Sequence, residues 1–170
     1  MRKTILLMCV LLLASVVALG QGMSVSTPAD QKFGPLPNFP SCAKGAVLHG
    51  DPGSDQGAVL MAKATAGCKI PWHWHTANEQ LGIVSGTTTM QEKDGQPKSM
   101  AAGSYVFMPG KHQHEFICKT ACALFVATDG KFDIHYVDAS GKEISLADAT
   151  KSGKAGGAMK SGEKKAAPKK

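Results

Sequence analysis

The stretch from Gly67 to Gly86 reads GCKIPWHWHTANEQLGIVSG, and the rest of the chain can be understood around it. His73 and His75 are two residues apart, so their side chains share one face if this segment is an extended strand. Residues 76–78 are small or polar and allow the chain to bend, which can return Glu79 to the same face. Two imidazoles and a carboxylate together can bind a divalent metal ion and leave room for a substrate. The alternative is a pair of ordinary histidines on a surface strand.

The pattern of apolar runs and turns predicts an all-β fold. From Gly45 to Val137, short apolar runs alternate with turn signals at a spacing of roughly ten residues, which is typical of a sandwich or barrel. We expect strands over 46–48, 57–66, 70–75, 79–84, 87–91, 105–108, 115–118, 122–128 and 132–137. Residues 144–150 are expected to form no more than one helical turn. The expected layout is an extended lead-in with room for one edge strand, a barrel and a C-terminal extension, over 21–44, 45–138 and 139–150.

The N-terminus has the features of a secretory signal peptide. A basic start at Arg2 and Lys3 precedes an apolar run from Ile5 to Leu19, and Gly20 closes a group of small residues. We therefore expect a signal peptide over residues 1–20, cleavage after Gly20, and a secreted or periplasmic protein without a membrane-spanning segment in the mature chain. The alternative is an uncleaved membrane anchor, for which the run is short.

The net charge of +6 comes from the two ends of the chain. Arg2 and Lys3 contribute +2, and residues 151–170, with seven Lys and one Glu, contribute +6, so residues 21–150 carry −2. This middle part contains no basic cluster, so nucleic acid is not an expected partner. Residues 151–170 have almost nothing to bury and are predicted to be disordered. They are either a solvated end or a tether to anionic surfaces.

Two motifs carry a family resemblance. The first comprises five positions, Gly67, His73, His75, Glu79 and Gly86. The second comprises Gly103, Pro109 and His114. In their spacing the two motifs resemble those of the cupin superfamily, and the resemblance covers residues 45–137. Two positions depart from the family pattern: Gly110 follows Pro109 directly, and Cys118 stands where the family often has Asn.

The resemblance implies a small antiparallel jelly-roll barrel with one divalent transition metal ion per chain, which can be Mn, Fe, Co, Ni, Cu or Zn. The ligands that it implies are His73, His75, Glu79 and His114. His112 competes for the last position, but the spacing from Pro109 favours His114.

Other residues near the motifs are assigned less specific roles. His112 is then a rim residue, a proton shuttle or a solvated side chain. We expect Leu81, Ile83 and Phe107 to be pocket or core residues. Trp72 and Trp74 alternate with the two histidines and are expected to face away from the pocket.

Four cysteines remain after removal of a signal peptide. Cys118 and Cys122 flank a short loop in a predicted hairpin, so they are candidates for a disulfide bond, which would leave Cys42 with Cys68. The alternatives are four buried thiols or a zinc site, for which the cysteine spacings match no common pattern.

The resemblance implies a fold but not a single reaction, because cupins include dioxygenases, decarboxylases, isomerases and non-catalytic sugar-binding or storage proteins. The first hypothesis is an exported metal-binding protein that holds a small organic molecule. If it is an enzyme, a dioxygenase-like oxidoreductase is expected before a decarboxylase or isomerase. The alternative is binding or sensing of a sugar or metabolite without chemistry, and a third idea is a structural metal. The family resemblance also suggests a homodimer.

Overall fold

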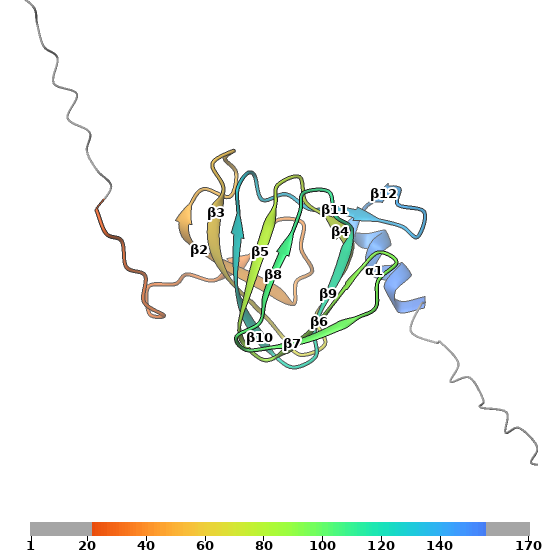
Figure 1. Ribbon diagram of the computed structural model, residues 1–170, viewed down its shortest axis with the longest axis horizontal. Helices are drawn as coiled ribbons and strands as arrows, with labels where there is room; N and C mark the ends of the chain where they lie inside the picture. The colour runs from red at the N-terminus through yellow and green to blue at the C-terminus, as the bar shows by residue number, and fades with distance from the viewer. Residues whose placement is uncertain (1–21, 156–170) are drawn as a thin grey trace, which may run out of the picture.

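Two six-stranded antiparallel sheets face each other and form a barrel in the computed structural model, which describes residues 22–155 (Figure 1). The predicted signal peptide, and the Lys-rich tail beyond Ala155, lie outside the described residues. No helix among residues 22–155 is both long enough and apolar enough to cross a membrane.

The order of the strands is that of a jelly roll. The first sheet contains β1 (Gly34–Pro35), β2 (Ala43–Gly50), β3 (Ala58–Ala64), β10 (Cys122–Thr128), β5 (Glu79–Ser85) and β8 (Tyr105–Met108), in that spatial order. The second contains β12 (Glu143–Ile144), β11 (His135–Val137), β4 (Lys69–Trp74), β9 (His114–Cys118), β6 (Thr87–Glu92) and β7 (Lys98–Ala101). Strands β10 and β9 each lie between two strands from earlier in the chain. The predicted all-β jelly-roll barrel is confirmed.

The core follows from the two-residue period of the strands. In β5, Leu81 and Ile83 are buried, and in β9, Phe116 and Cys118 are buried, while the residues between them are more exposed. The buried faces of the two sheets meet and form one apolar core. In β5 and β9 every second side chain is buried because successive residues of a strand point to opposite faces.

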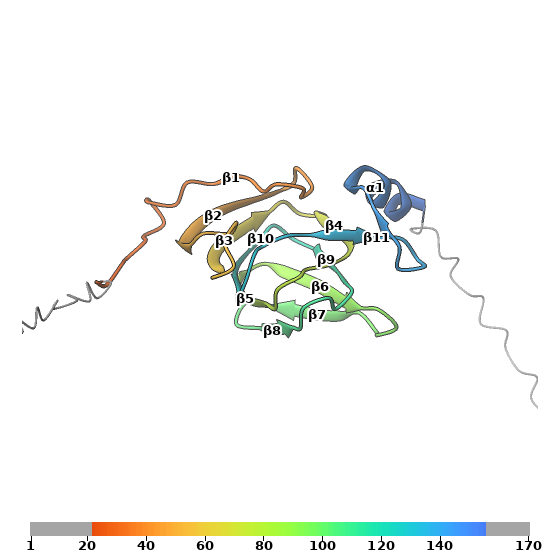
Figure 2. The same cartoon turned by 90° about the horizontal axis from the view of Figure 1, so that it is seen from above.

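The lead-in takes part in the fold more than its sequence indicates. Its strand β1 pairs with β2 at the edge of the first sheet, as Gly34 opposes Gly45. Leu36 and Phe39 pack against the apolar core. In Figure 2, β1, β2 and the C-terminal helix α1 lie toward one side of the barrel, and β7 and β8 lie toward the opposite side.

Two further elements differ from the sequence prediction. Strand β7 was not predicted because its sequence, KSMA, has no apolar alternation, and it forms by pairing with β6. Helix α1 (Leu146–Ala155) is longer than the single turn expected and continues past Thr150. The Ser145 hydroxyl accepts a hydrogen bond from the Asp148 amide at 3.2 Å and so caps the start of this helix.

Phe107 was expected to be a pocket or core residue, and it lines a cavity and does not lie in the core. In β8 the side chain of Met108 is buried at 4% exposure, whereas Phe107 is 53% exposed. The cause is strand alternation, because only one of two consecutive residues can face the core. Leu81 and Ile83 are buried as expected.

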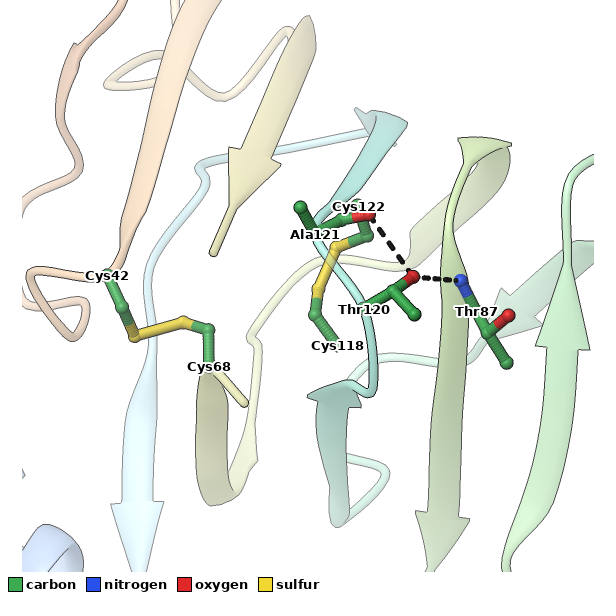
Figure 3. The surroundings of a disulfide bond; sticks show 7 residues. All are labelled: Cys42, Cys68, Thr87, Cys118, Thr120, Ala121 and Cys122. Atoms are coloured by element: carbon green, nitrogen blue, oxygen red, sulfur yellow. Dashed lines mark hydrogen bonds between the residues drawn. A yellow bond between two sulfur atoms is a disulfide. The ribbon is translucent and has the colours of Figure 1, made fainter. Parts of the chain in front are cut away.

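Two disulfide bonds fasten the segments that join the strands (Figure 3). Cys42 and Cys68, with Cα atoms 5.6 Å apart, link the end of the lead-in to the residue before β4. Cys118 and Cys122, with Cα atoms 5.8 Å apart, close the turn between β9 and β10. In this turn the Thr120 hydroxyl accepts a hydrogen bond from the Thr87 amide at 2.9 Å.

The two glycines that bound the first motif allow a test of this packing. Both have a positive φ, +76° at Gly67 and +84° at Gly86. A Cβ at Gly86 would lie 2.3 Å from the carbonyl oxygen of Ala121, whereas a Cβ at Gly67 would meet nothing within 4 Å. We expect Gly67→Ala to lower the free energy of unfolding by about 1 kcal/mol, the cost of a left-handed backbone. Gly86→Ala should cost roughly twice that or more, because backbone must also move.

Denaturant unfolding of both variants measures the difference. Equal losses of stability in Gly67→Ala and Gly86→Ala would show that the backbone at Ala121 does not pack closely against Gly86.

Candidate metal centre

Three histidines meet between the two sheets, and we call His73, His75 and His114 the histidine cluster. His73 on β4 is directly opposite His114 on β9 in the strand register, and His75 follows the end of β4. One ring nitrogen from each histidine lies within 4.8 Å of those of the other two. The ring centroids of His73 and His114 are 4.1 Å apart. All three residues are buried.

Glu79 brings a carboxylate to the same place. It is the first residue of β5 and is buried. Its Oε2 atom lies 3.5 Å from Nε2 of His75 and 3.6 Å from Nε2 of His114. The structure therefore brings together all four side chains that the sequence proposed as ligands. It separates them from His112, whose Nε2 lies 3.1 Å from the Glu92 carboxylate instead.

Backbone carbonyl groups orient the three imidazoles. The Nδ1 atom of His73 donates to the Pro71 carbonyl at 2.6 Å, and that of His114 donates to the His112 carbonyl at 2.9 Å. His75 makes the same bond to the carbonyl of Asp133. A carbonyl oxygen can only accept, so each proton is on Nδ1 and each Nε2 keeps a free lone pair. This is the tautomer that a metal ligand needs.

Pro71 explains part of this arrangement locally. The pairing of β4 with β9 is irregular between Ile70 and His73. Proline has no N–H group to donate to a neighbouring strand, so it occurs at such irregular positions. At this irregularity the Pro71 carbonyl accepts the hydrogen bond from the His73 ring two residues later.

The protonation states suit a cation. Burial, together with the nearby His114 and His75, lowers the pKa of His73 well below its usual value, so the ring is neutral. Burial by itself would raise the pKa of Glu79, but the neighbouring rings of His75 and His114 outweigh it, so the pKa is lowered and the carboxylate is ionised. Among the described residues Nε2 of His75 is buried without a hydrogen-bond partner. Such an orphan costs about 1–3 kcal/mol, and a metal ion would satisfy it.

A small apolar cavity of about 60 Å³ adjoins the histidine cluster. Leu81 lines it, as expected for a pocket residue. Phe132 stacks on the His75 ring with centroids 5.6 Å apart, and Phe39 stacks on Phe132 at 5.4 Å. The two phenylalanines therefore cover the lead-in side of the site and keep water away from His75.

Three residues that contribute to the site were not singled out from the sequence. Asp133 supports His75 through its carbonyl and accepts a hydrogen bond from the Thr76 amide at 2.8 Å through its carboxylate. Tyr136 is buried and donates to the Asn38 carbonyl at 2.9 Å, which holds the lead-in in place. Phe132 was expected in a strand, but β11 begins only at His135. The sequence contains no motif for them, because they act through contacts with residues distant along the chain.

Trp74 faces away from the cluster, as alternation predicts. It stacks on His135, with ring centroids 3.9 Å apart and ring planes 5° from parallel. His135 also lies 3.2 Å from the Glu143 carboxylate. These contacts pack the outer face of β4 and β11 and do not reach the cavity.

Residues 32–135, more than half of the chain, match a protein family described as "Domain of unknown function (DUF4437)". No curated protein matches the sequence.

Several solved structures have a similar fold. The polyketide cyclase RemF from Streptomyces resistomycificus is 18% identical with a TM-score of 0.60, covering 69% of this chain and 87% of that chain. An RmlC-like cupin from Ralstonia eutropha is 19% identical with a TM-score of 0.58, covering 80% and 90%. A putative acetylacetone dioxygenase from Methylibium petroleiphilum is 16% identical with a TM-score of 0.55, covering 74% and 88%. At these identities the likeness shows the fold, which is that of the cupins.

The lowered pKa of His73 predicts how stability depends on pH in chelator-treated protein. Below the usual value of 6.5, the unfolded chain binds a proton at this position that the folded chain does not. The free energy of unfolding should therefore fall as pH decreases below 6.5, by up to about 1.4 kcal/mol per pH unit for this one group. In a His73→Gln variant the slope between pH 6.5 and pH 5 should be smaller.

Urea unfolding at several pH values measures the slope. His49→Gln, a change at an exposed residue of β2, is the matched control and should keep the wild-type slope. An unchanged slope in His73→Gln would contradict a neutral, buried His73.

Proposed function

This chain belongs to the DUF4437 family and has the cupin fold, and from this premise we propose that it binds one divalent transition metal ion and a small organic molecule beside it. The metal ligands in this proposal are the histidine cluster and Glu79. The observation that carries it is the orientation of the cluster: backbone carbonyls fix three buried Nδ1–H groups, so the three Nε2 atoms are free for a shared ion.

Four ligands of this kind match the preferences of a transition metal ion. Three neutral imidazoles and one carboxylate leave one or two positions open on a five- or six-coordinate ion. When bound, such an ion supplies Lewis acidity or a centre for oxygen chemistry. The same donor set accepts Mn, Fe, Co, Ni, Cu and Zn, so availability selects among them.

The chain itself supplies orientation and a dry environment. The carbonyls of Pro71, His112 and Asp133 hold the rings, which is the usual task of groups behind metal ligands. Ionised Glu79 contributes one negative charge and lowers the net charge of a divalent site to +1. Phe132 and Phe39 exclude water on one side.

The enzymatic candidate is a dioxygenase-like oxidation of the small molecule. Apart from the four ligands, the cavity of about 60 Å³ is lined by apolar residues and Lys63. A reaction that needs no protein acid or base beside the metal suits such walls. Proteins described as enzymes are among the similar structures. The second candidate is binding or sensing without turnover, and the same apolar wall favours it because the exposed Lys63 is the one acid–base side chain in the lining besides the ligands.

We also propose that the protein is exported. Two disulfide bonds within residues 42–122 support this proposal, because structural disulfides persist mainly in oxidising compartments. The signal peptide on which export depends lies outside the described residues.

Two expected partners stay predictions. A homodimer would need a contact surface, and Tyr105, Phe107 and Phe125 are exposed aromatic side chains on β8 and β10, the two strands that flank β5 in the first sheet. Contact of the Lys-rich tail with anionic surfaces concerns residues mostly outside the described part of the chain.

Metal analysis of purified wild-type protein should give about one ion per chain, and His73→Ala or His114→Ala should lose it, because each removes one of four ligands. His112→Ala is the matched control for His114→Ala, since it removes an imidazole two residues away that lies outside the cluster. Retained metal in His114→Ala with loss in His112→Ala would contradict the ligand assignment. Absence of metal uptake in the wild type would overturn the proposed function.

The metal-loaded protein then separates the two candidates. Oxygen consumption with small phenols or thiols, lost in His73→Ala, would establish the oxidoreductase. Saturable binding without oxygen consumption or product would establish the binding protein.

Export predicts the N-terminus of the mature protein. N-terminal sequencing of protein from the extracellular or periplasmic fraction should begin at Gln21. A chain that keeps Met1 and remains in the cytoplasm would contradict export.

A further inference from the structure

The cavity beside the histidine cluster is too small for the whole of an organic ligand and has room only for the end that reaches the metal site. Its volume is about 60 Å³. Pockets that hold small organic molecules usually measure about 300–1,000 Å³. The body of any ligand that reaches the site must therefore lie elsewhere.

A second, larger cavity meets the site from the other side, and we call it the outer chamber. Its volume is about 430 Å³. Its walls come from β6, β7, β8 and the segment between β8 and β9, on the side of the barrel opposite the lead-in (Figure 2). Met90 and His114 line both cavities, so a molecule in the outer chamber can contact the His114 ring.

Most of the outer chamber is apolar. Three methionines line it, Met90, Met100 and Met108, together with Val106, Phe107 and Pro109. Phe107, which was expected to be a pocket or core residue, thus lines a cavity although its side chain is largely exposed. Methionine side chains adapt their shape, so this wall accepts apolar bodies of more than one form.

The polar part of the chamber is a single charged group of three side chains. Glu92 binds Lys98 at 3.1 Å through Oε1 and His112 at 3.1 Å through Oε2. Both carboxylate oxygens are thus occupied. Lys98 makes one hydrogen bond of the three that its ammonium group can donate, and its side chain is 73% exposed, so it lies where the chamber opens to solvent. The charged wall therefore offers spare donors and a positive charge to an incoming molecule.

We infer that the outer chamber binds a small organic anion, with its apolar body against the methionines, its carboxylate at Lys98 and its other end at His114. This inference rests on the proposed function, because it names the class of molecule that the metal site would receive. Glu92 is the positioning residue: its ion pair with Lys98 and its hydrogen bond with His112 hold both side chains at the wall. Charge favours an anion over an amine of the same shape, because the free donors belong to a cation and the only carboxylate in the lining is already paired.

Hexanoate tests the inference, with hexan-1-ol and hexylamine as probes of the same shape and different charge. Methyl-¹³C-methionine NMR of the full chain reports the place of binding. Hexanoate should shift the methyl signals of Met90, Met100 and Met108 in a saturable way. Signals of Met61, which lines neither cavity, and of exposed Met23 should stay unchanged. Hexanol should bind more weakly than hexanoate, and hexylamine more weakly still.

Two variants test the two parts of the chamber. Lys98→Gln should weaken hexanoate binding roughly two- to fivefold, as expected for an exposed charge, and should leave hexanol binding unchanged. Lys44→Gln, at an exposed lysine of β2 on the other sheet, is the matched control and should bind as the wild type does. Met100→Trp should reduce binding of hexanoate and hexanol alike by roughly tenfold or more, because the indole fills the chamber. Met100 is at the edge strand β7 and only partly buried, so the larger ring has space to be accepted.

The outcomes separate this inference from the proposed function. Hexanoate is tested against both metal-loaded and chelator-treated protein. Saturable shifts of the methyl signals of the three methionines in both forms would support binding in the outer chamber even if the wild type took up no metal. Metal binding without any hexanoate-induced shift of these methyl signals would contradict anion binding in the outer chamber and would leave the proposed metal site unaffected. Equal binding of hexanoate and hexylamine, or no effect of Lys98→Gln, would overturn the anion preference.

Discussion

The pairing of β4 with β9 is the constraint on which the site depends. It places His73 directly opposite His114 across two neighbouring strands. The period of a strand is two residues, so a shift of one residue would turn the ring of either histidine to the opposite face. The irregularity around Pro71 belongs to the same pairing and supplies the carbonyl that orients His73. One local feature thus fixes both the position and the tautomer of a proposed ligand.

The remaining parts of the site are held by contacts between segments far apart in the sequence. His75 donates to the carbonyl of Asp133, 58 residues later. Phe39, from the lead-in, covers Phe132, which in turn covers His75. The Cys42–Cys68 disulfide joins the end of the lead-in to the start of β4, so the covering segment and the strand that carries His73 are covalently linked. The site is closed on this side, and the larger cavity meets His114 on the other.

Much of the fold could be predicted, and the errors have physical causes. Alternating runs such as Glu79–Val84 give strands because half of their residues must be buried. Strand β7 was missed because its residues carry no such signal and depend on β6 for pairing. Phe107 was left open as a pocket or a core residue because hydrophobicity alone does not say which face of β8 points inward. The single helical turn predicted within residues 144–150 is shorter than α1, because the prediction did not take account of the cap that Ser145 provides.

The sequence by itself determined the four candidate ligands, the family resemblance and the antiparallel barrel, because these depend on residue type and spacing along one or two strands. The tertiary structure alone decided which groups hydrogen-bond or cover the proposed ligands and which cavities connect the site with solvent. Asp133, Phe132 and Phe39 reach the cluster only through folding of the chain, and no local pattern marks them. The two cavities, one too small for the whole of an organic ligand and one large enough, depend on how two sheets pack, and packing is a property of the whole barrel.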